Sequence, residues 1–476
     1  MSTEKHKVIV IGSGPGGSVT ATLLAEQGMD VLLLEAGRHL SLEDTPAFTT
    51  SEMQNKYKNG GITLAFGKSK VTYVEGGSVG GGSEVNSGLY HRLPEYLLSQ
   101  WERNFEFDVN RTFLEETYQQ IEKDICISYM PKPPKASLKL KEGADKLGWD
   151  VKEIPRWHKY KNKEDIGVKQ SMTETYIPRF LKANGTLKAQ HRAKKILKKS
   201  NGFEVICSFR DSNGEMLERK YSSEFLFVAC GAVSTPSLLQ RSGIRRKIGD
   251  TLSLHPSFKY TALFDEQINK DGMGVPVHQV KEFSPKVSFG CSISSYPYIG
   301  LALNDSNRLH RAKEWKKMAN YYCMISPEGI GSVRNLPFFK SPLVRFKMTE
   351  RDYKNIRDGY RNLAKLLFEA GAKELFPSVQ KSISIKNISD ISQIDSLSKS
   401  ALNLMTIHLF CTTPMSGNRN KGPVNADGEL HDVKNLFVCD GSILCSSPSV
   451  NPQGTIMAFS MMNAHKFINK HKTNEF

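Results

Sequence analysis

Residues 8–37 read VIVIGSGPGGSVTATLLAEQGMDVLLLEAG and contain the pattern that decides the fold. An apolar run at 8–11 predicts a strand that leads into the glycine-rich turn 12–17. A helix is expected from about residue 18 to 27, and a second strand over 31–34. A strand, a glycine turn, a helix and a strand in this order predict the first unit of a dinucleotide-binding fold.

The spacing Gly12-x-Gly14-x-x-Gly17 gives each glycine a separate task. Gly12 permits the tight turn, Gly14 lets the backbone approach a pyrophosphate, and Gly17 lets helix and strand pack closely. The helix N-terminus offers free amides and a positive dipole end to the phosphates. Glu35, at the end of the second strand, is expected to accept hydrogen bonds from an adenosine ribose, which disfavours NADP. This unit does not separate NAD from FAD.

The composition is that of a folded protein with more than one core. The chain has 476 residues, 39% hydrophobic and 24% charged, which predicts two domains or one bilobal unit. The longest apolar runs are too short for a bilayer, so no transmembrane segment is expected. The run at 7–11 is needed as a strand, which argues against a signal peptide. Eight scattered Cys without a Cys-x-x-Cys pair predict free thiols, no metal site and a cytoplasmic location.

The formal net charge of +16 raises the question of an anionic partner. Lys and Arg are spread along the chain, and their densest cluster, 188–199, is interpreted as a solvated connection between a strand and a turn. No nucleic-acid motif accompanies it, so nucleic-acid binding is not expected.

Three later segments carry glycine-rich or polar turns. Residues 78–88 read SVGGGSEVNSG, residues 231–244 read GAVSTPSLLQRSGI, and Asp440-Gly441-Ser442 precedes the segment 451–455, NPQGT. With the first motif, and in this order, they resemble the glucose–methanol–choline (GMC) oxidoreductase family over nearly the whole chain. The resemblance implies FAD as the cofactor and a small-molecule alcohol as the substrate.

The resemblance is matched by physical reasons for contact with a flavin. Three consecutive glycines let backbone lie flat against the isoalloxazine ring, and Gly231 gives a second close approach after a strand. Asp440 can accept hydrogen bonds from ribityl hydroxyls, and a helix starting near Thr455 can direct its N-terminus at the flavin pyrimidine. A further helix is expected to start at 234–236. The expected cofactor contacts are Gly12, Gly14, Gly17, Glu35, Gly80, Gly81, Gly82, Ser83, Asn86, Gly231, Asp440, Gly441, Pro452 and Thr455.

The covalent state of the cofactor is also implied. Some family members carry a His that bonds to FAD just before the loop Asn. That position is Val85 here, so the resemblance implies non-covalent FAD.

The catalytic prediction rests on His408 and Asn451. The segment 408–417, HLFCTTPMSG, is similar to the family pattern His-x-x-Gly-Thr-x-x-Met-Gly, and Asn451 stands at the family's second active-site position. Alcohol oxidation requires a base for the hydroxyl proton, and His suits this near neutral pH. Asn can donate a hydrogen bond to the developing alkoxide. His255 is interpreted as a structural residue between the two domains.

Some residues depart from the family pattern. Cys411 replaces a Gly, Ser416 shifts the terminal Gly by one, and Arg245 stands where the second signature usually ends in Gly. These changes could reshape the pocket or mark a divergent activity. The GMC branch that includes cholesterol oxidases and long-chain alcohol oxidases is the most similar, through Gly80 to Gly82 and 370–372.

The expected fold is α/β, with a discontinuous Rossmann-like FAD domain and a second domain of a β-sheet plus helices that binds substrate. The FAD domain is expected at 1–105, 185–256 and 400–476, the cap and connecting segments at 106–184, and the substrate domain at 257–399. The leading function is FAD-dependent oxidation of an alcohol to an aldehyde or ketone. The alternatives are a lyase or decarboxylase on the same fold, and a catalytically silent flavin-binding protein. The electron acceptor, oxygen, a quinone or a carrier protein, stays open.

Overall fold

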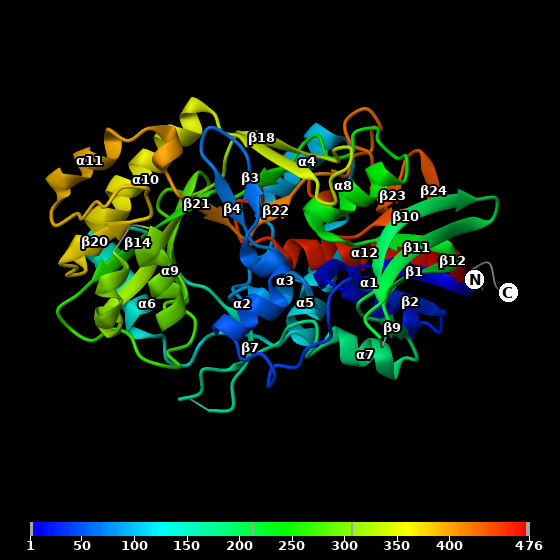
Figure 1. Ribbon diagram of the computed structural model, residues 1–476, viewed down its shortest axis with the longest axis horizontal. Helices are drawn as coiled ribbons and strands as arrows, with labels where there is room; N and C mark the ends of the chain where they lie inside the picture. The colour runs from blue at the N-terminus through cyan, green and yellow to red at the C-terminus, as the bar shows by residue number, and fades with distance from the viewer. Residues whose placement is uncertain (1–2, 163, 212, 306–307, 473–476) are drawn as a thin grey trace.

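The computed structural model describes residues 3–162, 164–211, 213–305 and 308–472. Its elements form two neighbouring lobes, with the N-terminal unit in one of them (Figure 1). In that unit β1 (Glu4–Ile11) leads into α1 (Pro15–Glu26) and β2 (Val31–Leu34). The strand–turn–helix–strand prediction is therefore confirmed. Helix α1 is buried on all sides from Gly16 to Ala25, which explains its small and apolar side chains.

The first lobe is built on a sheet of eight strands drawn from three parts of the chain. Its main path runs β10, β11, β12, β1, β2 and β9, with β24 beside β12 and β23 beside β24. The strands β9, β12, β1, β2 and β24 pair in parallel, whereas β10 and β11 are antiparallel. The bounds are β9 Thr186–Lys188, β10 Arg192–Lys199, β11 Gly202–Arg210, β12 Met216–Val228, β23 Glu429–Leu430 and β24 Val433–Val438.

The basic cluster 188–199 is not a loop. It contains the whole of strand β10, which lies at one edge of the first sheet, and begins with the last residue of β9. Lys194, Lys195, Lys198 and Lys199 are exposed on this strand, while Ile196 is buried. Charged side chains on an edge strand discourage pairing with another chain, which gives the cluster a structural reason.

The second lobe contains a sheet of nine strands, which supports the prediction of a second domain with a β-sheet and helices. The path runs β3, β4, β21, β14, β17, β16, β15 and β6, with β20 also beside β14. Helices α6 (Lys135–Lys146) and α10 (Glu350–Glu369) pack against one another and against strands of this sheet (Figure 1). The bounds are β3 Leu64–Ala65, β4 Val71–Tyr73, β6 Val151–Glu153, β14 Ser257–Leu263, β15 His278–Val280, β16 Val287–Cys291, β17 Met318–Ile325, β20 Glu374–Pro377 and β21 Leu404–Thr406.

The domain limits at residues 105, 184, 256 and 399 stay a prediction. Strands β3, β4 and β21 pair in the second sheet, although they lie in segments expected to form the FAD domain. The chain therefore passes between the lobes near residues 64–73 and 404–410.

Helix α8 (Gly231–Arg241) begins earlier than its proline suggests. The sequence predicted a start at 234–236, but the helix starts at Gly231 and holds Pro236 inside. Proline leaves the carbonyl four residues before it without its usual donor. That carbonyl, on Ala232, accepts a hydrogen bond of 2.8 Å from the Thr412 hydroxyl, which compensates for the missing amide.

The remaining elements surround the two sheets. They include α2 Thr50–Lys56, α3 Gly82–Val85, α4 Glu95–Phe105, α5 Arg111–Asp124, α7 Tyr176–Lys182, α9 Tyr296–Asp305, α11 Ser392–Asp395, α12 Gln453–Lys472, β5 Ile127–Ser128, β7 Arg156–Lys159, β8 Val168–Lys169, β13 Ser253–Leu254, β18 Ile330–Arg334, β19 Leu343–Lys347 and β22 Leu409–Phe410. Short 3-10 turns join several of them. Within the described ranges, no helix is long and apolar enough to cross a membrane.

Candidate active site

The predicted catalytic pair meets at the boundary between the two lobes. His408 lies between β21 and β22, and Asn451 lies in the turn before α12. The Nδ2 atom of Asn451 is 3.4 Å from Nε2 of His408. The Thr406 hydroxyl accepts a hydrogen bond from the His408 amide at 3.0 Å, which fixes the backbone at this point. The two residues are together, and their catalytic roles stay a prediction.

His255 contacts this pair directly, which the sequence interpretation did not anticipate. Its Nδ1 atom is 3.0 Å from Nδ1 of His408, and its Nε2 atom is 2.6 Å from the Ser447 hydroxyl. Strand β13 pairs with β22, and this register brings His255 beside His408. The His255 side chain is completely buried.

The hydrogen bonds select one arrangement of protons. When Asn451 Nδ2 donates, His408 Nε2 must be the acceptor and His408 Nδ1 carries the proton. His408 then donates to Nδ1 of His255, and His255 Nε2–H donates to Ser447. This arrangement leaves the basic nitrogen of His408 on the side of Asn451.

Burial keeps the two imidazoles neutral. It lowers the pKa of His408 to about 4. Burial lowers the pKa of His255 well below its usual value, and repulsion between the protonated forms of His255 and His408 lowers it further. Both rings are therefore uncharged near neutral pH, as a proton acceptor must be.

The second sheet supplies residues that no motif marked. The Nε2 atom of Gln279, on β15, is 3.3 Å from Oδ1 of Asn451 and 2.8 Å from the Tyr322 hydroxyl on β17. His91, in the segment before α4, is close to them: burial and the charges of Lys281 and His408 lower its pKa, and a hydrogen bond with Gln279 opposes this lowering. Alternation along the strand is the one sequence signal that could have pointed to Gln279.

The glycine loop 80–86 lies against the first glycine turn. A Cβ on Gly81 would be 2.8 Å from the Gly14 Cα atom, so only glycine allows this approach. The Ser83 hydroxyl donates to the Gly80 carbonyl at 2.8 Å. The Asn86 amide donates to Gln453 at 2.7 Å, which connects the loop to the first turn of α12. The loop thus lies between the N-termini of α1 and α12.

Two buried lysines, Lys169 and Lys56, contact this loop. The Lys169 ammonium donates to the carbonyls of Glu84 and Asn86 at 2.6 and 3.0 Å. The Lys56 ammonium lies 3.6 Å from the Glu84 carboxylate, and both side chains are almost fully buried. The contacts of Lys169 hold the loop backbone in place.

The Asp440 carboxylate has three hydrogen-bond donors within the protein. Its carboxylate accepts hydrogen bonds from the amides of Gly231 and Ser442, both at 2.8 Å, and from the Thr235 hydroxyl. Burial raises the pKa of this carboxyl above its ordinary value. Asp440 therefore joins the end of β24 to the N-terminus of α8, and a contact with ribityl hydroxyls stays a prediction. Gly441 lies in the same buried turn.

At the first glycine turn, Glu35 is held where β2 ends. Its carboxylate accepts hydrogen bonds from the Ser13 amide at 3.0 Å, the Ser13 hydroxyl at 2.7 Å and the Gly37 amide at 2.7 Å. The N-terminus of α1 has no side-chain cap. A Cβ on Gly14 would meet no described atom within 4 Å, whereas one on Gly17 would lie 2.0 Å from the Gly12 carbonyl.

Comparisons with known proteins agree with this arrangement. The GMC oxidoreductase family model matches residues 53–257 and 338–460, and a Rossmann-like NAD(P)-binding model matches 10–52. An uncharacterized GMC-type oxidoreductase of Sinorhizobium fredii is 35% identical over 98% of this chain and 95% of its own length.

The chain belongs to the GMC oxidoreductase family. It is thus an oxidoreductase, and family membership supports FAD as its cofactor. A long-chain-alcohol oxidase of Arabidopsis thaliana is 23% identical over 94% of this chain and 65% of its own length. A solved structure of Aspergillus oryzae formate oxidase has a TM-score of 0.75 at 15% identity and covers 99% of this chain and 100% of its own, which shows a shared fold.

The residues of this GMC oxidoreductase fit an FAD molecule. The uncapped N-terminus of α1 and the open space at Gly14 suit a pyrophosphate, and Glu35 has lone pairs left for ribose hydroxyls. The loop 80–86 is bonded to the first turn of α12, where Pro452 and Thr455 are buried. Asn451, just before this turn, contacts His408. Val85 is buried and has no atom that could bond to a flavin.

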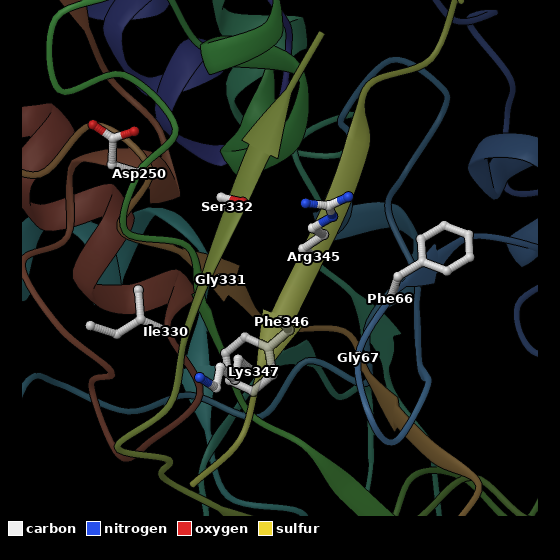
Figure 2. Close-up of a pocket in the computed structure, with 9 residues that line it drawn as sticks. All are labelled: Phe66, Gly67, Asp250, Ile330, Gly331, Ser332, Arg345, Phe346 and Lys347. Carbon is white, nitrogen blue, oxygen red and sulfur yellow. The ribbon is translucent and has the colours of Figure 1, made fainter. Parts of the chain in front are cut away.

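A surface groove of this GMC oxidoreductase lies elsewhere. Its volume is about 550 Å³, and Phe66, Asp250, Ile330, Arg345 and Lys347 are among its lining residues (Figure 2). None of the predicted catalytic or cofactor residues lines it.

Proposed function

We propose that this protein oxidises an alcohol to an aldehyde or ketone with non-covalent FAD, and that His408 is the base. The observation that best supports this proposal is the contact of 3.4 Å between Asn451 Nδ2 and His408 Nε2. It leaves an unprotonated imidazole nitrogen beside an amide donor, as proton removal from a hydroxyl requires.

FAD, when bound, supplies the hydride acceptor of the reaction. His408 Nε2 accepts the hydroxyl proton of the substrate, and Asn451 donates a hydrogen bond to the oxygen that becomes negative. His255 acts as a positioning residue, because it holds the proton of His408 on Nδ1 and so keeps Nε2 free.

The cofactor contacts belong to the same proposal. Gly12, Gly14 and Gly17 with the N-terminus of α1 hold the pyrophosphate, and Glu35 binds the adenosine ribose. Gly80, Gly81 and Gly82 support the ring, and Val85 leaves it without a covalent link. Asp440 contacts the ribityl hydroxyls, and Ser83, Asn86, Gly231, Gly441, Pro452 and Thr455 complete the proposed contacts.

Anaerobic mixing with a panel of alcohols tests the function. When the matching alcohol is added, an alcohol oxidase or dehydrogenase should lose the absorption of its oxidised flavin, because hydride from the substrate reduces it. A lyase or decarboxylase turns its substrate over without net reduction. Product formation with a flavin that stays oxidised would therefore favour the second candidate and contradict the first.

A further inference from the structure

Lys281 has a buried ammonium group that forms no ion pair with a side chain in the described part of the chain. It directly follows β15, and among the described residues its ammonium nitrogen is buried without a hydrogen-bond partner. An isolated charge in such a place is costly unless a ligand compensates it.

Strand alternation gives the direction of Lys281. His278 faces helix α6, where its Nδ1 atom is 2.9 Å from the Ser137 hydroxyl. Gln279 faces the other side, toward Asn451 at 3.3 Å. The Lys281 amide bonds to the Asp150 carbonyl at 2.7 Å, which continues the pairing with β6 by one residue. Lys281 therefore points to the same side as Gln279, the side of the candidate active site.

The pKa shifts around Lys281 agree with this direction. Its positive charge helps to lower the pKa of both His91 and His255. Burial lowers the pKa of Lys281 itself to about 8, with a further lowering by Lys152 and an opposing effect of Asp150. Asp150 is exposed and lies 3.6 Å from the Lys152 ammonium, and it acts on Lys281 through its charge without an ion pair between the two side chains.

Other buried polar atoms lie near the same place. The ring nitrogens of His91 and the Oε1 atom of Gln279 are buried there, and a hydrogen bond with the Gln279 side chain partly opposes the lowering of the His91 pKa, so these two residues face each other. The phosphates of FAD do not explain Lys281, because their proposed site is at α1 in the first lobe and Lys281 belongs to the second sheet.

We infer that Lys281 binds a carboxylate of the substrate, so that the molecule oxidised beside His408 is a hydroxy acid. A single ammonium matches the single charge of a carboxylate better than the charge of a phosphate monoester. The carboxylate half of the inference stands on Lys281, and the hydroxyl half rests on the proposed function.

Binding of simple anions to the FAD-loaded protein tests the carboxylate half. Calorimetric titration should give butyrate an affinity about ten- to hundredfold higher than butyramide, because a charge-assisted bond is lost with the amide. Lys281→Met should remove this difference and Lys281→Arg should keep most of it. Lys286→Met, which changes an exposed lysine nearby, should have no effect.

Three results would overturn the inference. They are equal butyrate affinity in wild type and Lys281→Met, equal affinity of the wild type for butyrate and butyramide, and inorganic phosphate binding as tightly as butyrate. A lowered flavin midpoint potential in Lys281→Met with unchanged butyrate affinity would instead assign the lysine to the cofactor.

A second measurement separates this inference from the proposed function. Flavin reduction should be faster with ω-hydroxy acids of graded length than with the matched 1-alcohols, and Lys281→Met should lose that preference. If butyrate binding depends on Lys281 but no alcohol or hydroxy acid reduces the flavin, the anion site stands and the proposed function is wrong. If alcohols reduce the flavin equally in wild type and Lys281→Met, with no preference for the acids, the function stands and the inference is wrong.

Discussion

The Nδ1 atom of His255 lies 3.0 Å from Nδ1 of His408, across 153 residues of sequence. Together with the bond of 2.6 Å from His255 to Ser447, this contact determines which nitrogen of His408 faces Asn451. The proposed base is thus oriented by a buried residue from a distant segment of the chain.

Replacement of His255 should slow flavin reduction while FAD stays bound. In His255→Leu the proton of His408 is no longer held on Nδ1, so we expect a loss of about ten- to hundredfold in the reduction rate. His255→Asn should keep more activity, because the amide oxygen can accept the same proton. Stopped-flow reduction checks both variants. Equal rates in the two would mean that the imidazole of His255 only fills space.

The pH dependence of reduction should follow the low pKa of His408. Burial lowers that pKa to about 4, so the base is already neutral above about pH 6. The reduction rate at saturating substrate should rise with pH only below that range and stay level to about pH 8. A midpoint near the ordinary histidine value of about 6.5 would contradict this account.

The affinity for a hydroxy acid should fall at the alkaline end. Lys281 has a pKa lowered to about 8 by burial, and it loses its charge as the pH rises through that value. The dissociation constant of butyrate should therefore rise above about pH 8 in the wild type and stay flat in Lys281→Met. Titrations at several pH values check this, with His91 and His255 already neutral throughout.

Glu35 should matter for retention of FAD. Glu35→Ala removes an acceptor for ribose and frees Ser13 and Gly37, so FAD affinity should fall about ten- to hundredfold without loss of the fold. Fluorescence titration of the apoprotein with FAD measures this. The control Glu43→Ala, at an exposed position, should bind like the wild type. Unchanged affinity in Glu35→Ala would mean that another residue holds the ribose.

Local patterns predicted local structure well. Gly12, Gly14 and Gly17 act over one turn, so their spacing was enough to predict β1, α1 and β2. The pairing of His408 with Asn451 came from family resemblance, because their contact depends on how the two lobes meet. The sequence around His255 resembled a family element but did not indicate its contact with His408. No motif marked Gln279 or Lys281. The position of Gln279 on β15, and of Lys281 just after it, depends on a sheet assembled from distant segments.

The start of α8 shows a similar limit. Pro236 predicted a helix start just before it, and the Thr412 hydroxyl that compensates for the missing amide lies 180 residues from Ala232. A contact over such a distance cannot be deduced from the residues around the proline.

The most direct test of the account is the rate of anaerobic flavin reduction in His408→Ala at saturating substrate. With FAD still bound, the rate should fall about 10²- to 10⁴-fold relative to the wild type, and by less in Asn451→Ala, because only the first variant removes the base. His310→Ala, at an exposed histidine, should reduce like the wild type. Reduction of His408→Ala at the wild-type rate would contradict the proposal that His408 takes the proton.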